Sequence, residues 1–458
     1  MELIAGSDFM RLFSAYDTEI KSSMNENGVI ISLNKRILDD TLSVCRNALA
    51  YIIPVLNDHY EEWEELKGTD RNNYCEHLIH STRNNIAICD FDRLFYKFPS
   101  GIRRSAVSEA MGIVSSYRSN HKNWEAEKKG NEPKLSFDHY WMPVIYRKNP
   151  SYAGGEIEKS SRLVYRLKVY KNHDWVWMSI VLGNNDVSYI ERHCAGRKEC
   201  SPALKKSHGR YYITWAFEEQ AELSDKEVMD CRICAVDLGI CSDAACTMMD
   251  STGTVYARNV INFAYEKDQI NHLCNRIRKN QKAGRSVRSL WSYAQNFNTM
   301  LSRKVANAII SFAVEHDADV IVFEYLDTSG KKKGSRKQKL HLWKHRDIQK
   351  LTEYKAHQLG MRISHVCAWG TSKLAFDGSG EVKRGKEVSK TTPYNVCCFR
   401  NEKQYNCDLS ASYNIGARYY LREISIQYKV YFLPSTPKLT LSDLCKANKE
   451  LGLVSYKP

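Results

Sequence analysis

Ile233-Cys-Ala-Val-Asp237-Leu-Gly-Ile240 is the stretch that decides the fold of the C-terminal half: four apolar residues run directly into an aspartate. A short apolar run bounded by turn residues is typical of a buried strand, and a buried carboxylate is too costly to be incidental. The pattern recurs in Asp319-Val-Ile-Val-Phe-Glu324, where a second strand ends in an acid. A third acid opens the helical stretch Asp408-Leu-Ser-Ala-Ser-Tyr-Asn-Ile-Gly-Ala-Arg418.

The elements around these acids alternate between strands and helices. We expect two further strands at 244–249 and 254–258, followed by a long basic helical stretch. After Glu324 come a Gly/Ser/Lys-rich loop, a helix, a strand at 362–367 and a last helix from Asp408. A strand with a hairpin, helices, a strand, a helix, a strand and a helix is the order expected of an RNase H-like fold.

The N-terminal half has a different pattern. Residues 1–130 place apolar residues at helical spacing, and Pro99 opens one of the amphipathic segments. From about 133 to 221 the period falls to two, which predicts a small antiparallel barrel or sandwich. The sequence therefore predicts an α/β multidomain protein, with a helical domain at 1–130, a small antiparallel β domain at 131–228 and an α/β domain after it.

The charge of the chain is high and uneven. Its 458 residues carry 67 Lys and Arg against 53 Asp and Glu, a formal net charge of +14, and residues 271–350 alone hold 17 basic against 6 acidic side chains. Such a concentration favours contact with a polyanion, with a solvated charged face as the alternative. The apolar runs fall short of the ~18 residues that a membrane span needs, and the N-terminus has no secretory pattern, so we expect a cytoplasmic protein.

The three acids have a chemistry in common. Brought together at the carboxyl ends of neighbouring strands they would repel one another, and hard divalent cations with oxygen ligands relieve that repulsion. Two such ions about 3.5–4 Å apart can hold a scissile phosphate and stabilise both the attacking and the leaving oxygen. Each acid also has a simpler interpretation: a turn residue for Asp237, a strand-end salt bridge for Glu324 and a helix N-cap for Asp408. The combination favours a catalytic site at which all three bind two magnesium ions.

These motifs resemble the three RuvC motifs of the transposon-encoded TnpB nucleases and of the miniature type V CRISPR effectors. The resemblance rests on residues 235–240, 320–326 and 408–418, and extends to Thr371-Ser-Lys373 and to Phe98-Pro-Ser-Gly-Ile-Arg-Arg104. It implies an RNA-guided DNA endonuclease with one magnesium-dependent RuvC site, whose partners are a guide RNA and target double-stranded DNA. Such a protein is nucleoid-associated when bound to DNA.

The resemblance also gives the predicted domains their roles. Residues 1–130 become a helical recognition domain and 131–228 a β-rich wedge domain. The RuvC nuclease domain then takes 229–366 as its first part and 408–458 as its final helix and C-terminal tail. Between them, 367–407 is a degenerate zinc-ribbon-like insertion that binds the target nucleic acid.

The insertion departs from the family, whose ribbon normally supplies two Cys-x-x-Cys pairs. The expected positions read Ala375, Gly378, Cys398 and Asn401, so three of four ligands are missing and we expect no zinc. Cys231-x-x-Cys234 and His193-Cys194…Cys200 have no matching partner pair. Without a secretory pattern, the fifteen cysteines are expected to be mostly reduced.

Eighteen basic residues are candidates for contact with nucleic acid, where cations on phosphates position a strand without reading its sequence. A solvated face is the alternative for the N-terminal pair, and a structural salt bridge for the last residue. The candidates are Arg103, Arg104, Arg276, Arg278, Lys279, Lys282, Arg285, Arg288, Lys331, Lys332, Lys333, Arg336, Lys337, Lys339, Lys344, Arg346, Lys373 and Arg418.

Two other functions use the same residues. One is an RNase H-like transposase or resolvase that works without guide RNA, which the β domain and the Thr371-Ser element disfavour. The other is a guide-dependent DNA binder without cleavage, which has no physical use for three clustered acids. Both a transposon nuclease and a CRISPR effector of antiviral defence fit a chain of this length, with or without a second copy of the chain as a partner.

Overall fold

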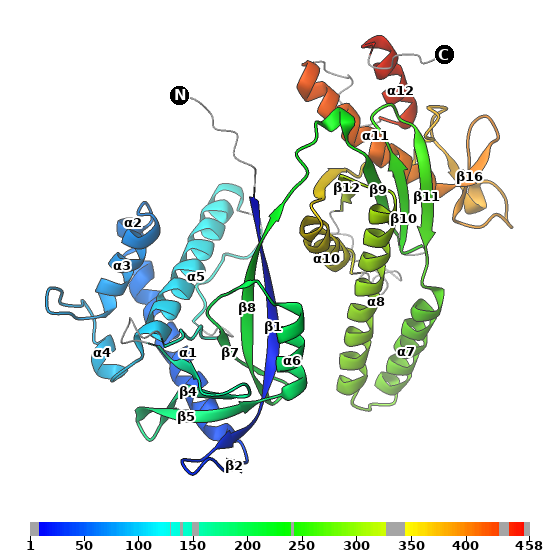
Figure 1. The fold of residues 1–458 in the computed structure, drawn as a ribbon. Helices are drawn as coiled ribbons and strands as arrows, with labels where there is room; N and C mark the ends of the chain where they lie inside the picture. Colours follow the sequence, from blue (N-terminus) through cyan, green and yellow to red (C-terminus); the bar gives the residue numbers. More distant parts are fainter. Residues whose placement is uncertain are drawn as a thin grey trace. The chain divides into compact units, whose positions relative to one another are not determined.

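The computed structural model describes residues 9–128, 130–137, 141–148, 155–239, 242–326, 344–429 and 439–452. Contacts between residues divide the chain into an N-terminal unit, Phe13–Glu219, and a C-terminal unit, Gln220–Pro458 together with Met1–Leu12 (Figure 1). Within the described residues, every helix is too short or too polar to span a membrane.

The N-terminal unit combines helices with an antiparallel sheet. The strands are β1 (Phe9–Met24), β2 (Ile30–Ile31), β3 (Ile157–Lys159), β4 (Val164–Lys171), β5 (Asp174–Leu182), β6 (Lys198–Glu199), β7 (Ala203–Ser207) and β8 (Arg210–Glu222). Their order is β3-β4-β5-β1-β8-β6, with β2 on β1 and β7 on β8. The helices are α1 (Lys35–Asp58), α2 (Tyr60–Trp63), α3 (Gly68–Ile79), α4 (Phe91–Leu94), α5 (Ser100–Glu127) and α6 (Asn184–His193).

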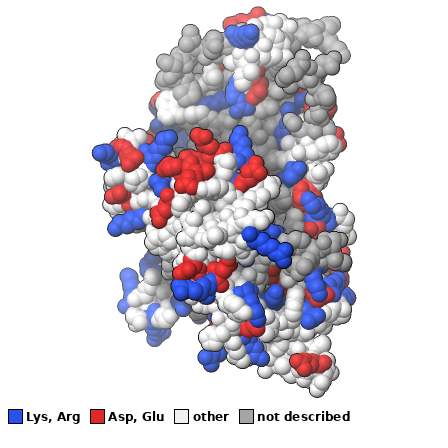
Figure 2. All heavy atoms as spheres, turned by 90° about the vertical axis from the view of Figure 1, so that its left-hand side faces the viewer, with Lys and Arg blue, Asp and Glu red and all other residues white. Residues whose placement is uncertain are grey.

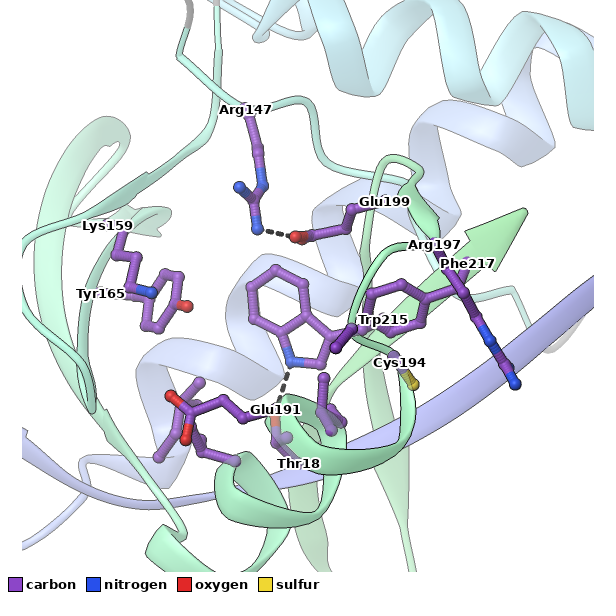
Figure 3. A pocket seen from close by; sticks show the side chains of 14 residues that line it. Thr18, Arg147, Lys159, Tyr165, Glu191, Cys194, Arg197, Glu199, Trp215 and Phe217 are labelled. Atoms are coloured by element: carbon purple, nitrogen blue, oxygen red, sulfur yellow. Dashed lines mark hydrogen bonds and ion pairs between the residues drawn. The ribbon is translucent and has the colours of Figure 1, made fainter. Parts of the chain in front are cut away.

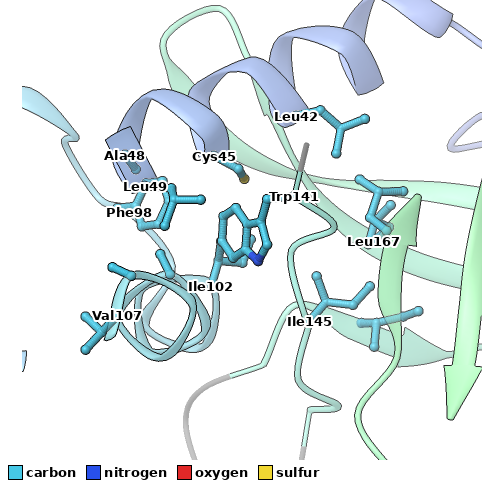
Figure 4. Packing of buried hydrophobic residues seen from close by; sticks show 14 of the residues in the cluster. Leu42, Cys45, Ala48, Leu49, Phe98, Ile102, Val107, Trp141, Ile145 and Leu167 are labelled. Atoms are coloured by element: carbon cyan, nitrogen blue, oxygen red, sulfur yellow. The ribbon is translucent and has the colours of Figure 1, made fainter. Parts of the chain in front are cut away.

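Strand β1 corrects the prediction of a helical segment at the start of the chain. Its side chains alternate between exposed and buried, as on a half-buried strand, and it pairs with β5, which lies more than 150 residues further along. The helices and the sheet also share one core. Figure 4 shows Cys45 and Leu49 of α1, Ile102 of α5 and Leu167 of β4 around Trp141. The boundary predicted at residue 130 therefore falls inside one unit.

Helix α5 begins against a buried carboxylate. Glu156, 1% exposed, accepts hydrogen bonds from the backbone N–H groups of Gly101 (3.1 Å) and Tyr146 (2.9 Å). Burial raises the pKa of Glu156, and these two bonds oppose that effect. The contact leaves no space for a side chain at Gly101, because a Cβ there would collide with Oε2 of Glu156 and lie 2.6 Å from the Tyr146 ring.

Gly101→Ala should lower the free energy of unfolding of the N-terminal unit by about 1–3 kcal/mol, the usual effect of overpacking. Gly112→Ala is the matched control, because Gly112 lies in the same helix and a Cβ there meets nothing within 4 Å. Helix propensity should make the control variant more stable by about 0.5–1 kcal/mol. Denaturant melts followed by circular dichroism measure both, and equal effects would contradict the packing argument.

The C-terminal unit is built on a five-stranded sheet. Its strands are β9 (Ile233–Leu238), β10 (Ala244–Met249), β11 (Val255–Ile261), β12 (Val320–Tyr325) and β13 (Arg362–Cys367), in the order β11-β10-β9-β12-β13. β10 is antiparallel to β9 and β11, whereas β12 is parallel to β9 and β13. The helices are α7 (Ala264–Lys282), α8 (Arg288–Glu315), α10 (His345–Gln358), α11 (Cys407–Tyr428) and α12 (Leu441–Glu450). The predicted order of strands and helices is confirmed.

Helices cover both faces of this sheet, which explains why β9 and β12 carry apolar residues on both faces up to Asp237 and Glu324. Cys234 and Val236 of β9 pack with α7, α8 and α10. Ile233 and Ala235, which alternate with them, pack with α11 and α12. Between β13 and α11 lies a small sheet of β14 (Lys383–Arg384), β15 (Val396–Cys398) and β16 (Gln404–Asn406).

Candidate active site

Two of the three predicted acids lie on adjacent parallel strands and on the same face of the sheet. β9 and β12 pair up to Phe323 opposite Val236, so that Glu324 follows directly beside Asp237. Alternation places both on the face that α11 covers, because the residues two positions before each acid, Ala235 and Val322, pack with α11. Asp408 lies in the first turn of α11 itself. Three segments distant in the sequence thus bring their carboxylates to one place.

The electrostatics of the site show that the three carboxylates interact. Burial raises the pKa of Asp237 well above its usual range, and the neighbouring Glu324 and Asp408 raise it further, against the opposing effect of Arg384. Burial also raises the pKa of Glu324, while its hydrogen bond with Thr371 and the charge of Arg418 lower it. Buried acids that repel one another are typical of a functional site, because stability alone gives no reason for them.

The helix N-cap interpretation of Asp408 is wrong. The side chain of Asn406 caps α11, accepting from the backbone N–H groups of Asp408 (2.9 Å) and Leu409 (3.0 Å). The Asp408 carboxylate instead accepts a hydrogen bond from the hydroxyl of Ser242 (2.7 Å). Ser242, which lies shortly before β10, was not among the predicted site residues.

The site has the donor chemistry of a divalent-cation site. All three side chains are carboxylates, and hard cations such as Mg²⁺ take oxygen ligands. As the side chains stand, no group of three or more His, Cys, Asp or Glu in the described part of the chain is close enough to hold a metal ion. Glu324 accepts a hydrogen bond from the hydroxyl of Thr371, and Asp408 accepts one from the hydroxyl of Ser242.

The predicted nucleic-acid contacts fall into three groups. Those at 331–339, which are Lys331, Lys332, Lys333, Arg336, Lys337 and Lys339, lie outside the described residues. Most of the others are exposed: Arg276, Arg278, Lys279 and Lys282 on α7, Arg285 and Arg288 at the turn to α8, Arg346 on α10 and Lys373 after β13. Lys344 is partly buried, donates to Thr299 (2.8 Å) and pairs with Asp347 (3.3 Å).

The remaining candidates have internal partners, which corrects the prediction that Arg103 and Arg418 contact a strand. Arg103, 7% exposed, donates from Nε (3.1 Å) and Nη2 (2.9 Å) to Glu76. Arg104 is exposed but pairs with the other oxygen of Glu76 (3.3 Å). Arg418, 6% exposed, donates to the backbone carbonyls of Cys367, Trp369 and Leu439.

The N-terminal unit contains a cavity of about 250 Å³ that the sequence did not predict. Figure 3 shows Trp215 across from Lys159 and Tyr165, with Arg147 and Glu199 above. Arg147 and Glu199 form an ion pair, so their charges largely cancel. Figure 2, seen from the side of the N-terminal helices, shows both acidic and basic side chains on the face in view. The exposed basic helical hairpin of α7 and α8 is the stronger candidate for a nucleic-acid surface.

Solved structures share this fold. One is a complex of Cas12f1 with single-guide RNA and target DNA (TM-score 0.52, 15% identity, 83% of this chain and 81% of that chain). Another is the mini-RNA-guided endonuclease CRISPR-Cas_phi3 (TM-score 0.50, 12% identity, 89% and 92%). The chain therefore has a mixed α/β multidomain fold of the kind found in miniature Cas12 effectors. A family model described as the Aq_aa04 family matches residues 26–171. A search of curated protein sequences finds no match.

Asp237→Asn should stabilise the C-terminal unit in the absence of metal. The pKa of Asp237 is higher in the folded state than in the unfolded chain. The contribution of Asp237 to the free energy of unfolding is therefore fully present below its unfolded-state pKa of ~3.9, and it is lost as the pH rises through its folded-state pKa. The free energy of unfolding of the variant should therefore exceed that of the wild type by an amount that grows from acid to neutral pH, at about 1.4 kcal/mol for each unit by which folding raises the pKa of Asp237. Thermal melts in EDTA across this range measure the difference. The exposed Asp225, changed to Asn, should show none.

Replacing Arg276 and Lys279 on α7 by Gln should weaken binding to a DNA duplex. If both side chains bind phosphates, the slope of log affinity against log salt should become shallower by about 0.9 for each phosphate that is no longer neutralised. Lys122 and Lys128, exposed residues at the end of α5, serve as a charge-matched pair of controls. A slope that changes equally in both double variants would make α7 an ordinary solvated face.

Proposed function

We propose that this chain is an RNA-guided DNA endonuclease with a single RuvC active site formed by Asp237, Glu324 and Asp408. The observation that carries the proposal is the convergence of these three buried or half-buried carboxylates on one sheet face, where burial and the two neighbouring acids raise the pKa of Asp237. The fold shared with RNA-guided nucleases supports it. A site for binding alone would gain nothing from mutually repelling acids.

The proposal assigns the C-terminal unit to the RNase H-like class. In its sheet, β9, β10 and β11 are antiparallel neighbours, and β12 and β13 are parallel additions. Its elements follow one another along the chain in the order that the sequence analysis expected of that class. The sheet and helices of the N-terminal unit would then supply the wedge and recognition functions, which bind guide RNA. Target double-stranded DNA is the second partner.

The three carboxylates would hold two magnesium ions, which supply charge stabilisation to the phosphate at the attacking and leaving oxygens. Ser242 orients Asp408 through its hydrogen bond, and burial excludes water from Asp237. The exposed cations of α7 and the start of α8 would hold the backbone of the nucleic acid without reading its sequence. Lys373, exposed on the turn after β13, would contact the strand near the site. The lysine-rich segment at 331–339 has the same proposed role.

Replacing Asp237, Glu324 or Asp408 by Ala should each abolish magnesium-dependent cleavage, by at least about 10²-fold, while guide-dependent DNA binding persists. The effects of replacing residues that act as a unit are not additive, so the triple variant should have about the same residual cleavage rate as each single variant. The assay uses the RNA that co-purifies with the full chain and a DNA target complementary to it. Asp225→Ala is the control, since this acid is exposed and outside the site.

Two outcomes would overturn the proposal. Substantial cutting by any one of the three variants would remove that residue from the site. Cutting that survives complete removal of RNA from the wild type would indicate a nuclease that works without a guide.

A further inference from the structure

The turn that follows β13 is tied to α11, the helix that carries Asp408. The side-chain amide of Asn414 on α11 donates to the backbone carbonyls of Thr371 (3.0 Å) and Leu374 (2.9 Å). Its carbonyl oxygen accepts from the backbone N–H of Leu441 (3.3 Å). Asn414 is fully buried, so these bonds are made without competition from water.

Arg418, one helical turn after Asn414, fixes the start of the same turn. Its guanidinium donates to the backbone carbonyls of Cys367 (2.7 Å) and Trp369 (2.9 Å), and also to that of Leu439 (3.0 Å). A planar guanidinium with donors in a fixed fork is suited to holding several carbonyls in one geometry. Asn414 and Arg418 together hold both ends of the turn against α11.

Thr371, which lies in the turn that Asn414 and Arg418 hold, contacts the active site. Thr371, 1% exposed, donates its hydroxyl proton to Oε1 of Glu324, with the Ala368 carbonyl (3.1 Å) as its alternative acceptor. Within the part of the chain that the structure describes, Oε2 of Glu324 has no hydrogen bond. One oxygen of this carboxylate is thus fixed, and the other is left to ligate.

We propose that Thr371 is a positioning residue for Glu324, and that Asn414 and Arg418 act through it. Helix α11 then presents Asp408 and, through the turn, also sets the orientation of Glu324. A carboxylate on a strand end can rotate about its side-chain torsions, whereas metal ligation requires a narrow range of directions. The proposal rests on the proposed function, because it takes Glu324 to be a magnesium ligand.

The test compares Thr371→Val, which keeps the shape but removes the hydroxyl, with Thr371→Ser, which keeps the hydroxyl. Thr352→Val is the matched control, because Thr352 is also fully buried but its hydroxyl donates to the Ile348 carbonyl within α10 (2.9 Å). Titration of the full chain with Mn²⁺, followed by electron paramagnetic resonance, measures the metal site without cleavage. Asp237→Ala identifies which binding belongs to that site.

Thr371→Val should weaken this Mn²⁺ binding by about 10–100-fold, the usual effect of losing a residue that orients a ligand. It should raise the magnesium concentration for half-maximal cutting while DNA affinity stays unchanged. Thr371→Ser should restore most of both, and Thr352→Val should match the wild type. Melting temperatures of all variants show that the comparison is made between folded proteins.

Wild-type Mn²⁺ binding and magnesium dependence in Thr371→Val would overturn the positioning role. Equal impairment of the Ser and Val variants would do the same, because the hydroxyl would then not be the cause. These results are distinct from a failure of the proposed function. If Asp237→Ala and Glu324→Ala cut normally, the active site itself is misassigned, whereas inactive acid variants beside a normal Thr371→Val remove only the role of Thr371.

Discussion

The parallel pairing of β9 with β12 is the constraint on which the rest of the candidate site depends. Side chains on a strand alternate between faces, so a slip of one residue in this register would move Glu324 to the opposite face from Asp237. The apolar residues on either side prevent such a slip, because each is buried against the helices of its own face. Gly416 adds to this by letting α11 lie close to the sheet: a Cβ there would come within 3.3 Å of the Ala235 Cβ. Register and close packing together set the distances among the three acids.

The same arrangement is unfavourable for stability. Two buried carboxylates beside a third resist ionisation, and the surrounding side chains compensate only in part. Arg384 opposes the rise in the pKa of Asp237, and Thr371 and Arg418 oppose the rise in that of Glu324. Sites that break the ordinary rules of burial are expected where function requires it. The hydrogen bonds from α11 to the turn after β13 can therefore be understood as the support that holds an unfavourable group in place.

Much of the C-terminal unit could be predicted from the sequence, because its strands are short, apolar and bounded by turn residues. The expected strands at 244–249 and 362–367 match β10 and β13 residue for residue. The alternation of apolar strands with helices also made it possible to predict that the two strand-end acids meet. The sequence of each strand does not tell which residues of β9 and β12 lie opposite each other. Only the pairing in the structure shows that Asp237 and Glu324 share a face.

The errors arose where a residue's partner is distant in the sequence. β1 looks unremarkable by itself, and only β5 and β8 make it a strand of a sheet. Arg103 is a basic residue in a basic stretch until Glu76, 27 positions earlier, is seen to accept its hydrogen bonds. Asn406 and Asp408 are both good N-cap residues, and the hydrogen bonds alone decide between them. Local pattern identifies what an element is, but not which of two similar side chains takes which role.

The small sheet before α11 shows how a fold element can be held without the ligands that its resemblance implies. Strands of two or three residues are too short to be stable by themselves, and a structural zinc would normally contribute the missing free energy. Here the two turns that would carry the cysteine pairs are joined by a hydrogen bond from Asn401 to Asp377 (3.0 Å) and by packing of Phe376 on Phe399. A buried apolar cluster that includes Cys397 lies beneath them. The absence of zinc stays a prediction, but its physical basis is that packing and hydrogen bonds already connect the two turns that a metal would otherwise have to hold together.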